Sequence, residues 1–129
     1  MAKIKVKVEK TETGYSAYAE KFGAFTTGTT YDQLVSNMVE ALNFYFEDEK
    51  VKRKVITLDD ILFEFELNSL FEVYPINMKG LAERLKMNYT LLAQYATGKK
   101  KPSQKQTEKI LQGINQVGRE LSELTLVAN

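Results

Sequence analysis

The chain has 129 residues, 43% of them hydrophobic and 27% charged, which is typical of one folded domain or two small ones. The absence of cysteine and histidine excludes disulfides, thiolate chemistry, and the commonest metal ligand and general base. No apolar run approaches the ~20 residues that span a membrane, and the first residues alternate charged and β-branched side chains unlike a signal peptide, so we expect a cytoplasmic protein with no membrane partner.

The first module is predicted to have an α+β fold with a small antiparallel sheet. In KIKVKVEK, residues 3–10, Ile4, Val6 and Val8 alternate with polar residues, a pattern typical of a strand buried on one face. After the polar turn TETG, the segments YSAYAE and AFTTGTT are short candidate strands. The segment DDILFEFEL predicts a fourth strand. In it one face carries Ile61, Phe63, Phe65 and Leu67, and the other carries Leu62, Glu64 and Glu66.

A single helix is expected between the third and fourth strands. Thr30 is a candidate N-cap, and Gln33 three residues later would complete a capping box. Apolar residues then recur at intervals of three and four, which indicates one buried helix face. These residues are Leu34, Val35, Met38, Val39, Leu42, Tyr45 and Phe46. The charged run EDEKVKRK is expected to end the helix.

The formal net charge of +1 hides two halves of opposite sign. Residues 1–74 contain nine Lys and Arg against thirteen Asp and Glu, a net charge of −4, whereas residues 75–129 contain nine against four, a net charge of +5. This asymmetry predicts two modules with different partners. Phosphate neutralisation gives a basic module affinity for nucleic acid, and an acidic module suits a basic protein.

The second module, residues 75–129, is expected to be all-helical. Pro75 disfavours helix at Tyr74 and marks the boundary. Asn77 is a candidate N-cap for MKGLAERLK, and Asn88 is one for YTLLAQYAT. Gly98 is expected to end the second helix, and Pro102-Ser103 to open a third helix from about Gln104 to Leu124.

The first two of these helices predict a helix-turn-helix. Ala82 is placed where the helices cross, with Leu81, Leu85, Leu92 and Tyr95 toward the core. On the outer side of the second helix, Thr and Gln side chains can hydrogen-bond base edges and Ala can contact a thymine methyl. The candidate base-reading residues are Asn88, Tyr89, Thr90, Ala93, Gln94 and Thr97. The candidate phosphate-binding residues are Asn77, Lys79, Lys99, Lys100 and Lys101. The alternative is a pair of helices that only pack together.

The third helix carries an apolar stripe with heptad spacing. Its members are Ile110, Ile114, Val117, Leu121 and Leu124. The stripe either packs within its own domain or forms the interface of a homodimer or higher homo-oligomer. Gly113 and Gly118 weaken the helix by roughly 1 kcal/mol each, but small residues there allow another helix to approach.

Two stretches resemble known families. LAERLKMNYTLLAQYATGKKKPS resembles the helix-turn-helix of phage-repressor-type (XRE/Cro-type) regulators, although the turn usually has glycine where this chain has Lys86. TGYSAYAEKFGAFTTGTTYDQLVSNMVEALNFYF resembles the sheet-and-helix module of HicB-type antitoxins. Gly23 and Gly28 stand at the two glycines of that family's motif, while Gln33 and Leu34 replace its usual acidic and alanine residues.

The resemblance to HicB-type proteins implies a transcription-regulating antitoxin of a toxin–antitoxin system. Residues 1–74 would be a partial RNase H-like module that binds and neutralises HicA, a small basic toxin that cleaves mRNA. Residues 75–129 would bind operator DNA and repress the gene pair. Neither an enzyme nor a cofactor is expected, because metal-dependent nucleases need several converging carboxylates and here only Glu64 and Glu66 share a strand face.

Two other functions are compatible with the same residues. One is a stand-alone transcription regulator whose first module senses a ligand or a protein. The other is an interaction adaptor whose basic surface binds no DNA.

Overall fold

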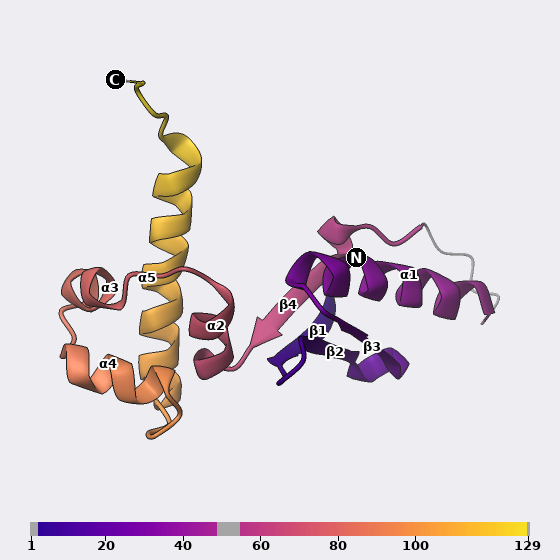
Figure 1. The fold of residues 1–129 in the computed structure, drawn as a ribbon, viewed down its shortest axis with the longest axis horizontal. Coiled ribbons are helices and arrows are strands. Elements are labelled where there is room, and N and C mark those ends of the chain that lie inside the picture. The colour runs from indigo at the N-terminus through magenta and orange to yellow at the C-terminus, as the bar shows by residue number, and fades with distance from the viewer. Residues whose placement is uncertain (1–2, 49–54, 129) are drawn as a thin grey trace. The chain divides into compact units, whose positions relative to one another are not determined.

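The computed structural model describes residues 3–48 and 55–128 (Figure 1). The elements are β1 (Ile4–Lys10), β2 (Tyr15–Ala19), the 3₁₀ turn η1 (Glu20–Phe22), β3 (Ala24–Gly28), α1 (Tyr31–Asp48), the 3₁₀ turn η2 (Leu58–Asp60), β4 (Ile61–Phe65), α2 (Leu67–Val73), α3 (Met78–Leu85), α4 (Tyr89–Ala96) and α5 (Gln104–Glu123). The chain forms two compact units, an N-terminal unit of residues 1–73 and a C-terminal unit of residues 74–129. The division falls one residue before the boundary expected between Tyr74 and Pro75.

The N-terminal unit contains a four-stranded mixed sheet in the order β3-β2-β1-β4. The pairs β1–β2 and β2–β3 are antiparallel, but β4 runs parallel to β1, with Ile4 opposite Ile61. The expectation of an antiparallel sheet was therefore wrong for the fourth strand. The physical reason is the connection: α1 carries the chain back along the sheet after β3, so β4 enters in the direction of β1 rather than returning through a hairpin.

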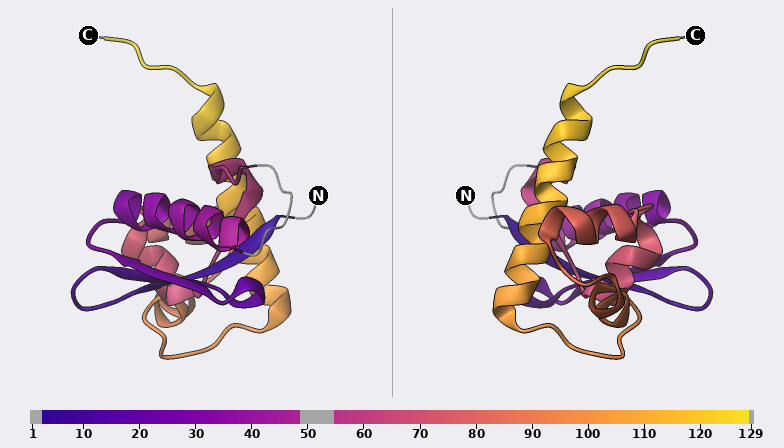
Figure 2. Two further views of the ribbon diagram at one scale, coloured as in Figure 1. Left: turned by 90° about the vertical axis from the view of Figure 1, so that its right-hand side faces the viewer. Right: turned by 90° about the vertical axis from the view of Figure 1, so that its left-hand side faces the viewer.

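The core of this unit lies between the sheet and α1, which covers one face of the strands (Figure 2). The expected alternation of β1 and the expected stripe of α1 are confirmed: Val6, Val8 and Leu34 are fully buried. Val35, Val39 and Tyr45 are only half-buried at the edge of the stripe. The buried cluster consists of Ile4, Val6, Val8, Ala17, Ala19, Ala24, Leu34, Met38, Leu42, Phe46, Ile56 and Ile61.

The start of α1 is capped nearly as the sequence predicts. The Thr30 hydroxyl accepts a hydrogen bond from the Gln33 backbone N–H at 3.1 Å. The Gln33 side chain reaches back one residue further than a capping box requires, because its Oε1 accepts from the backbone N–H and the hydroxyl of Thr29, at 2.7 and 2.9 Å. The charged run expected to end the helix covers residues 47–54, of which residues 49–54 lie outside the described part of the chain.

The segment after α1 differs most from expectation. The expected strand over residues 59–67 is reduced to β4, because Asp60 closes a capping box with Thr57 and Leu67 begins a helix. Within β4 the alternation is confirmed, with Ile61 buried and Leu62 exposed. The helix α2, which contacts β1, was not predicted. Its apolar residues are spaced as in a helix, but seven residues before a proline are too few to make that spacing distinct from a strand or a linker.

The C-terminal unit is built from α3, α4 and α5, and no strand occurs in residues 74–128 (Figure 1). The expected core is confirmed, since Leu81, Ala82, Leu85, Leu92 and Tyr95 are at most 8% exposed. Ile110 belongs to the same core at 1% exposure. It was expected as a candidate for a dimer seam, but a side chain buried inside its own unit offers no surface to a second chain.

The two glycines of α5 have different surroundings. A Cβ at Gly113 would lie 2.5 Å from Cδ2 of Leu85 and 3.3 Å from its Cγ, so glycine allows α3 to pack closely against α5. A Cβ at Gly118 would meet no atom within 4 Å. The expectation that a small residue admits another helix is thus confirmed at Gly113, whereas Gly118 faces open space.

Candidate nucleic-acid interface

The connection between α3 and α4 is fixed at both helix starts by asparagine caps. The Asn77 side chain accepts from the Gly80 N–H at 3.1 Å, and the Asn88 side chain accepts from the N–H groups of Thr90 and Leu91 at 2.8 and 3.3 Å. Caps of this type stabilise a helix by about 1 kcal/mol each. Both were predicted from the sequence, so the positions at which the two helices begin are explained by local chemistry.

Lys86 ends α3 in the left-handed conformation, with φ of 54°. Its N–H donates to the carbonyls of Ala82 and Glu83, and the Met87 N–H donates to Ala82 O at 2.9 Å. Glycine is the usual residue for this backbone conformation, and lysine adopts it at a modest cost. The tight turn is therefore kept although its usual residue is missing.

The outer face of α4 presents polar side chains next to a buried opposite face. Thr90 and Thr97 are exposed, Tyr89 is 43% exposed, and Ala93 and Gln94 are half-buried, whereas Leu92, Tyr95 and Ala96 are buried. The spacing of the exposed set places it on one side of the helix. The structure thus brings together on one surface five of the six residues expected to read bases.

These side chains differ in how much hydrogen-bonding capacity they retain. The Asn88 oxygen is used as the helix cap, and the Thr97 hydroxyl donates to Ala93 O at 3.0 Å. In the described part of the chain, the side chains of Thr90 and Gln94 make no hydrogen bond. An amide offers both donors and an acceptor, which matches the edge of adenine in the major groove. Gln94 and Thr90 are consequently the strongest base-reading candidates.

The three lysines after α4 lie in a loop that is held at both ends. Gly98 turns the chain with φ of 81°, and the N–H groups of Gly98 and Lys100 donate to Tyr95 O and Gln94 O, both at 3.2 Å. At the other end, the Ser103 hydroxyl accepts from the Gln106 N–H at 3.1 Å and caps α5. Lys99, Lys100 and Lys101 are all exposed. The loop therefore presents three cations beside the end of α4.

A fourth cation lies near the start of α4. The ammonium group of Lys79 is 5.7 Å from the centre of the Tyr89 ring, a cation–π contact that links the first turns of α3 and α4. Lys79 and Asn77 are both exposed. The candidate phosphate-binding residues therefore flank α4, with Asn77 and Lys79 near its beginning and the lysine loop after its end.

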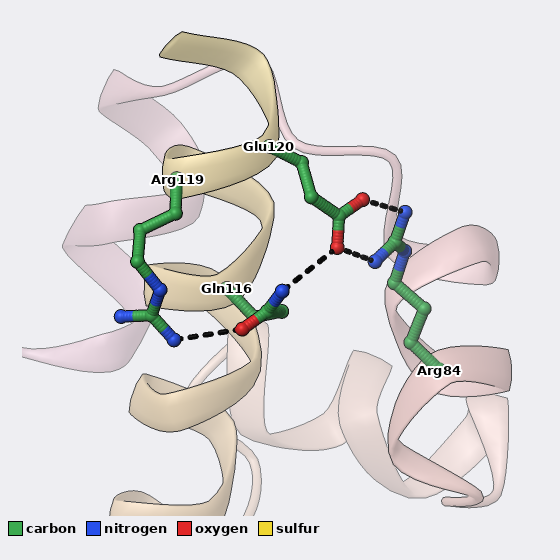
Figure 3. Close-up of polar contacts among 4 residues, drawn as sticks. All are labelled: Arg84, Gln116, Arg119 and Glu120. Carbon is green, nitrogen blue, oxygen red and sulfur yellow. Dashed lines mark hydrogen bonds and ion pairs between the residues drawn. The ribbon is translucent and has the colours of Figure 1, made fainter. Parts of the chain in front are cut away.

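A polar network on α3 and α5 was missed by the sequence reasoning (Figure 3). The guanidinium of Arg84 donates two hydrogen bonds, both 2.8 Å long, to the two carboxylate oxygens of Glu120. Gln116 also donates to Glu120 at 3.2 Å, and Arg119 donates to Gln116 at 2.7 Å. Because Arg84 and Glu120 are 36 positions apart, no local pattern could indicate the pair.

The network changes which charges the unit offers to a ligand. Hydrogen bonds from Arg84 and then Gln116 lower the pKa of Glu120 to about 2, and Glu120 in turn raises the pKa of Arg84 above its ordinary value. Glu120 stays ionised and neutralises Arg84. Arg84 is therefore less available to phosphate than Lys79 and the exposed lysines of the loop.

Replacing Glu120 with glutamine is expected to remove an acid-dependent part of the stability. The pKa of Glu120 in the folded chain lies below its ordinary value of 4.5, so its contribution is complete above that value and is lost as the pH falls toward about 2. Urea unfolding followed by circular dichroism at pH 6 and pH 3 measures this. The wild type should exceed Glu120→Gln in stability at pH 6 and lose most of that advantage at pH 3. An equal difference at both pH values would show that the ionisation of Glu120 does not stabilise the fold.

Residues 3–48 and 55–128 contain neither a cluster of metal ligands nor a membrane-spanning helix. No three acidic, histidine or cysteine side chains there come close enough together to bind a metal ion. No helix in those ranges has the length and apolar character required to cross a bilayer. Comparison with protein-family models, with curated proteins and with solved structures finds no match for this chain.

Proposed function

We propose that the C-terminal unit is a helix-turn-helix domain that binds double-stranded DNA, with α4 as its recognition helix. The observation that carries this proposal is the outer face of α4, where Thr90 and Gln94 are accessible beside three exposed lysines. Lysine contacts to phosphates supply affinity without sequence preference, and the α4 side chains supply discrimination between bases. The charge of +5 on residues 74–129 supports the same function.

The N-terminal unit is, in this proposal, a partial RNase H-like module that neutralises a HicA-type toxin. Residues 1–73 have a net charge of −4, and α1 and β3 contain no Lys or Arg. Phe25 on β3 and Phe44 on α1 are 62% and 72% exposed and line one groove with Glu40. Exposed aromatic rings next to a carboxylate suit a basic protein partner. The whole chain would then be an antitoxin that also represses its own operon.

The partner proposal is tested by co-expression with the product of any small basic reading frame that adjoins the gene. A stable complex on gel filtration that also forms with a variant unable to bind DNA would support the antitoxin function. A chain that binds its promoter but forms no such complex would instead be a stand-alone transcription regulator.

Two copies of the chain are proposed to act together on the operator. A homodimer would present two α4 helices to a palindromic site whose half-sites are one helical turn, or a multiple of it, apart. Among the residues expected at the dimer seam, Leu121 and Leu124 are 62% and 56% exposed, whereas Ile114 and Val117 are half-buried.

Replacing Gln94 with alanine is expected to relax the sequence preference of DNA binding. Loss of a bidentate base contact costs about 1–3 kcal/mol on the preferred site and little on other sequences. Fluorescence anisotropy with the operator and with single-base variants of it measures the effect. Gln112→Ala, on the same unit but outside α4, is the matched control. An equal loss of affinity on every duplex would show that Gln94 does not read a base.

A further inference from the structure

The helix α5 carries an apolar stripe that is largely exposed in the described part of the chain. In α5, Leu111 and Leu121 are 53% and 62% exposed, Ile114 is half-buried, and Gly118 is exposed. Their spacing of three, four and three places them on one side of the helix, over roughly 15 Å of its length. We call these four residues the α5 stripe.

The α5 stripe is distinct from the side of α5 that packs on α3. On that inner side Ile110 is buried, Gly113 lies against Leu85, and Glu120 is paired with Arg84. At 100° per residue, the α5 stripe is turned from the inner side by roughly a quarter of a turn. The fold of the C-terminal unit therefore uses the inner side and leaves the α5 stripe available to a partner.

We infer that the α5 stripe is the surface through which two copies of this chain pair, with their α5 helices antiparallel. The stripe is symmetric about Gln116: an antiparallel pair centred there places Leu111 opposite Leu121, and Ile114 opposite Gly118 of the second copy. A branched side chain would then enter the space that a glycine leaves, because nothing lies within 4 Å of a Cβ at Gly118. A parallel pair would instead set glycine against glycine and leave a gap.

The charges on α5 favour the same direction. Glu108 near the start of the helix and Arg119 near its end lie on the side that borders the α5 stripe, and both are exposed. Antiparallel pairing centred on Gln116 keeps Glu108 and Arg119 away from the same residues of the second copy, whereas parallel pairing aligns like charges. The dipoles of two antiparallel helices also attract, because the positive end of each lies beside the negative end of the other. A second copy of the chain is thus complementary to the α5 stripe in size, and the charges on α5 favour the antiparallel direction.

The interface differs from the seam that heptad spacing predicts. Ile110 is buried in the core of its own unit, Val117 and Leu124 lie outside the α5 stripe, and Leu111 and Gly118 belong to it instead. The inference deepens the proposed function and rests on its dimeric form. Because the pairing involves no DNA, it can fail or succeed independently of DNA binding.

Sedimentation equilibrium of the full chain without DNA, across the micromolar range, tests the pairing. The wild type is expected to be a dimer. Leu121→Glu should raise the dissociation constant by about 100-fold, since the dimer loses two buried leucines, while the circular dichroism spectrum stays unchanged. Leu58→Glu, at a leucine of the N-terminal unit that is 54% exposed, should leave the dimer intact. A monomeric wild type, or a Leu121→Glu variant as dimeric as the wild type, would overturn the inference.

Cross-linking tests the direction, because the chain has no cysteine of its own. Copies carrying Leu111→Cys are mixed with tagged copies carrying Leu121→Cys and then oxidised. Antiparallel pairing predicts disulfides mainly between the two different variants. Disulfides mainly between identical variants would show parallel pairing and contradict the inferred geometry.

Discussion

Replacing Lys99, Lys100 and Lys101 together with glutamine is expected to weaken DNA binding about 100-fold near 0.15 M salt. Each phosphate contact contributes about 0.9 to the slope of log affinity against log salt, so removing three contacts lowers the slope by about 2.7. Between 1 M and 0.15 M salt, this difference in slope corresponds to roughly a 100-fold difference in affinity. The three lysines are exposed in a loop held by Gly98 and Ser103, so each can reach a phosphate at little cost in ordering.

The loss should be similar on every DNA sequence, because phosphate contacts carry no base information. Anisotropy titrations at several salt concentrations measure the affinity and the slope together. The matched control replaces Lys3, Lys5 and Lys7 with glutamine, which changes the net charge equally but in the N-terminal unit. If both triple variants lose the same affinity, the lysine loop acts only through the overall charge and does not contact the DNA.

Replacing Gly28 with alanine is expected to destabilise the N-terminal unit by about 3 kcal/mol or more. A Cβ there would lie 2.6 Å from the backbone nitrogen of Leu34 and 2.8 Å from its Cα. These are backbone atoms of α1, so the clash can be relieved only by moving the helix away from the sheet. Such a movement would disturb the packing of Leu34, which is fully buried. The measurement is urea unfolding of the full chain followed by circular dichroism.

Gly23 provides the control for this prediction. Its φ is 66°, so alanine there costs about 1 kcal/mol of backbone strain, but a Cβ would meet no atom within 4 Å. Gly28→Ala should therefore be clearly less stable than Gly23→Ala, while DNA affinity, assigned to the other unit, changes little in both. Equal stabilities for the two variants would mean that the contact between β3 and α1 is not a tight one.

The sequence was informative wherever local chemistry determines structure. The alternation of Val6 and Val8 indicated their burial, and Asn77, Asn88 and Ser103 indicated where three helices begin. The core positions of Leu81, Leu85 and Leu92 followed from helical spacing. Each of these predictions depends on a few neighbouring residues, which is why a single sequence was enough to make them.

The features that the sequence did not reveal depend on contacts between distant residues. The parallel pairing of β4 with β1 is set by the path of the chain, and the ion pair of Arg84 with Glu120 joins two helices 36 positions apart. The inward position of Ile110 also depends on where α3 packs, since heptad spacing alone does not distinguish an inner side of α5 from an outer one. The candidate DNA-reading face was predicted because it lies on a single helix.

Under the proposed function, the C-terminal unit distinguishes one DNA sequence from others. The most direct test is an anisotropy titration of the full chain with the DNA upstream of its own gene and with a shuffled duplex of equal length and composition, near 0.15 M salt. A sequence-specific DNA-binding protein is expected to bind the first at least about 1,000-fold more tightly than the second. Equal affinity for the two duplexes would contradict the account.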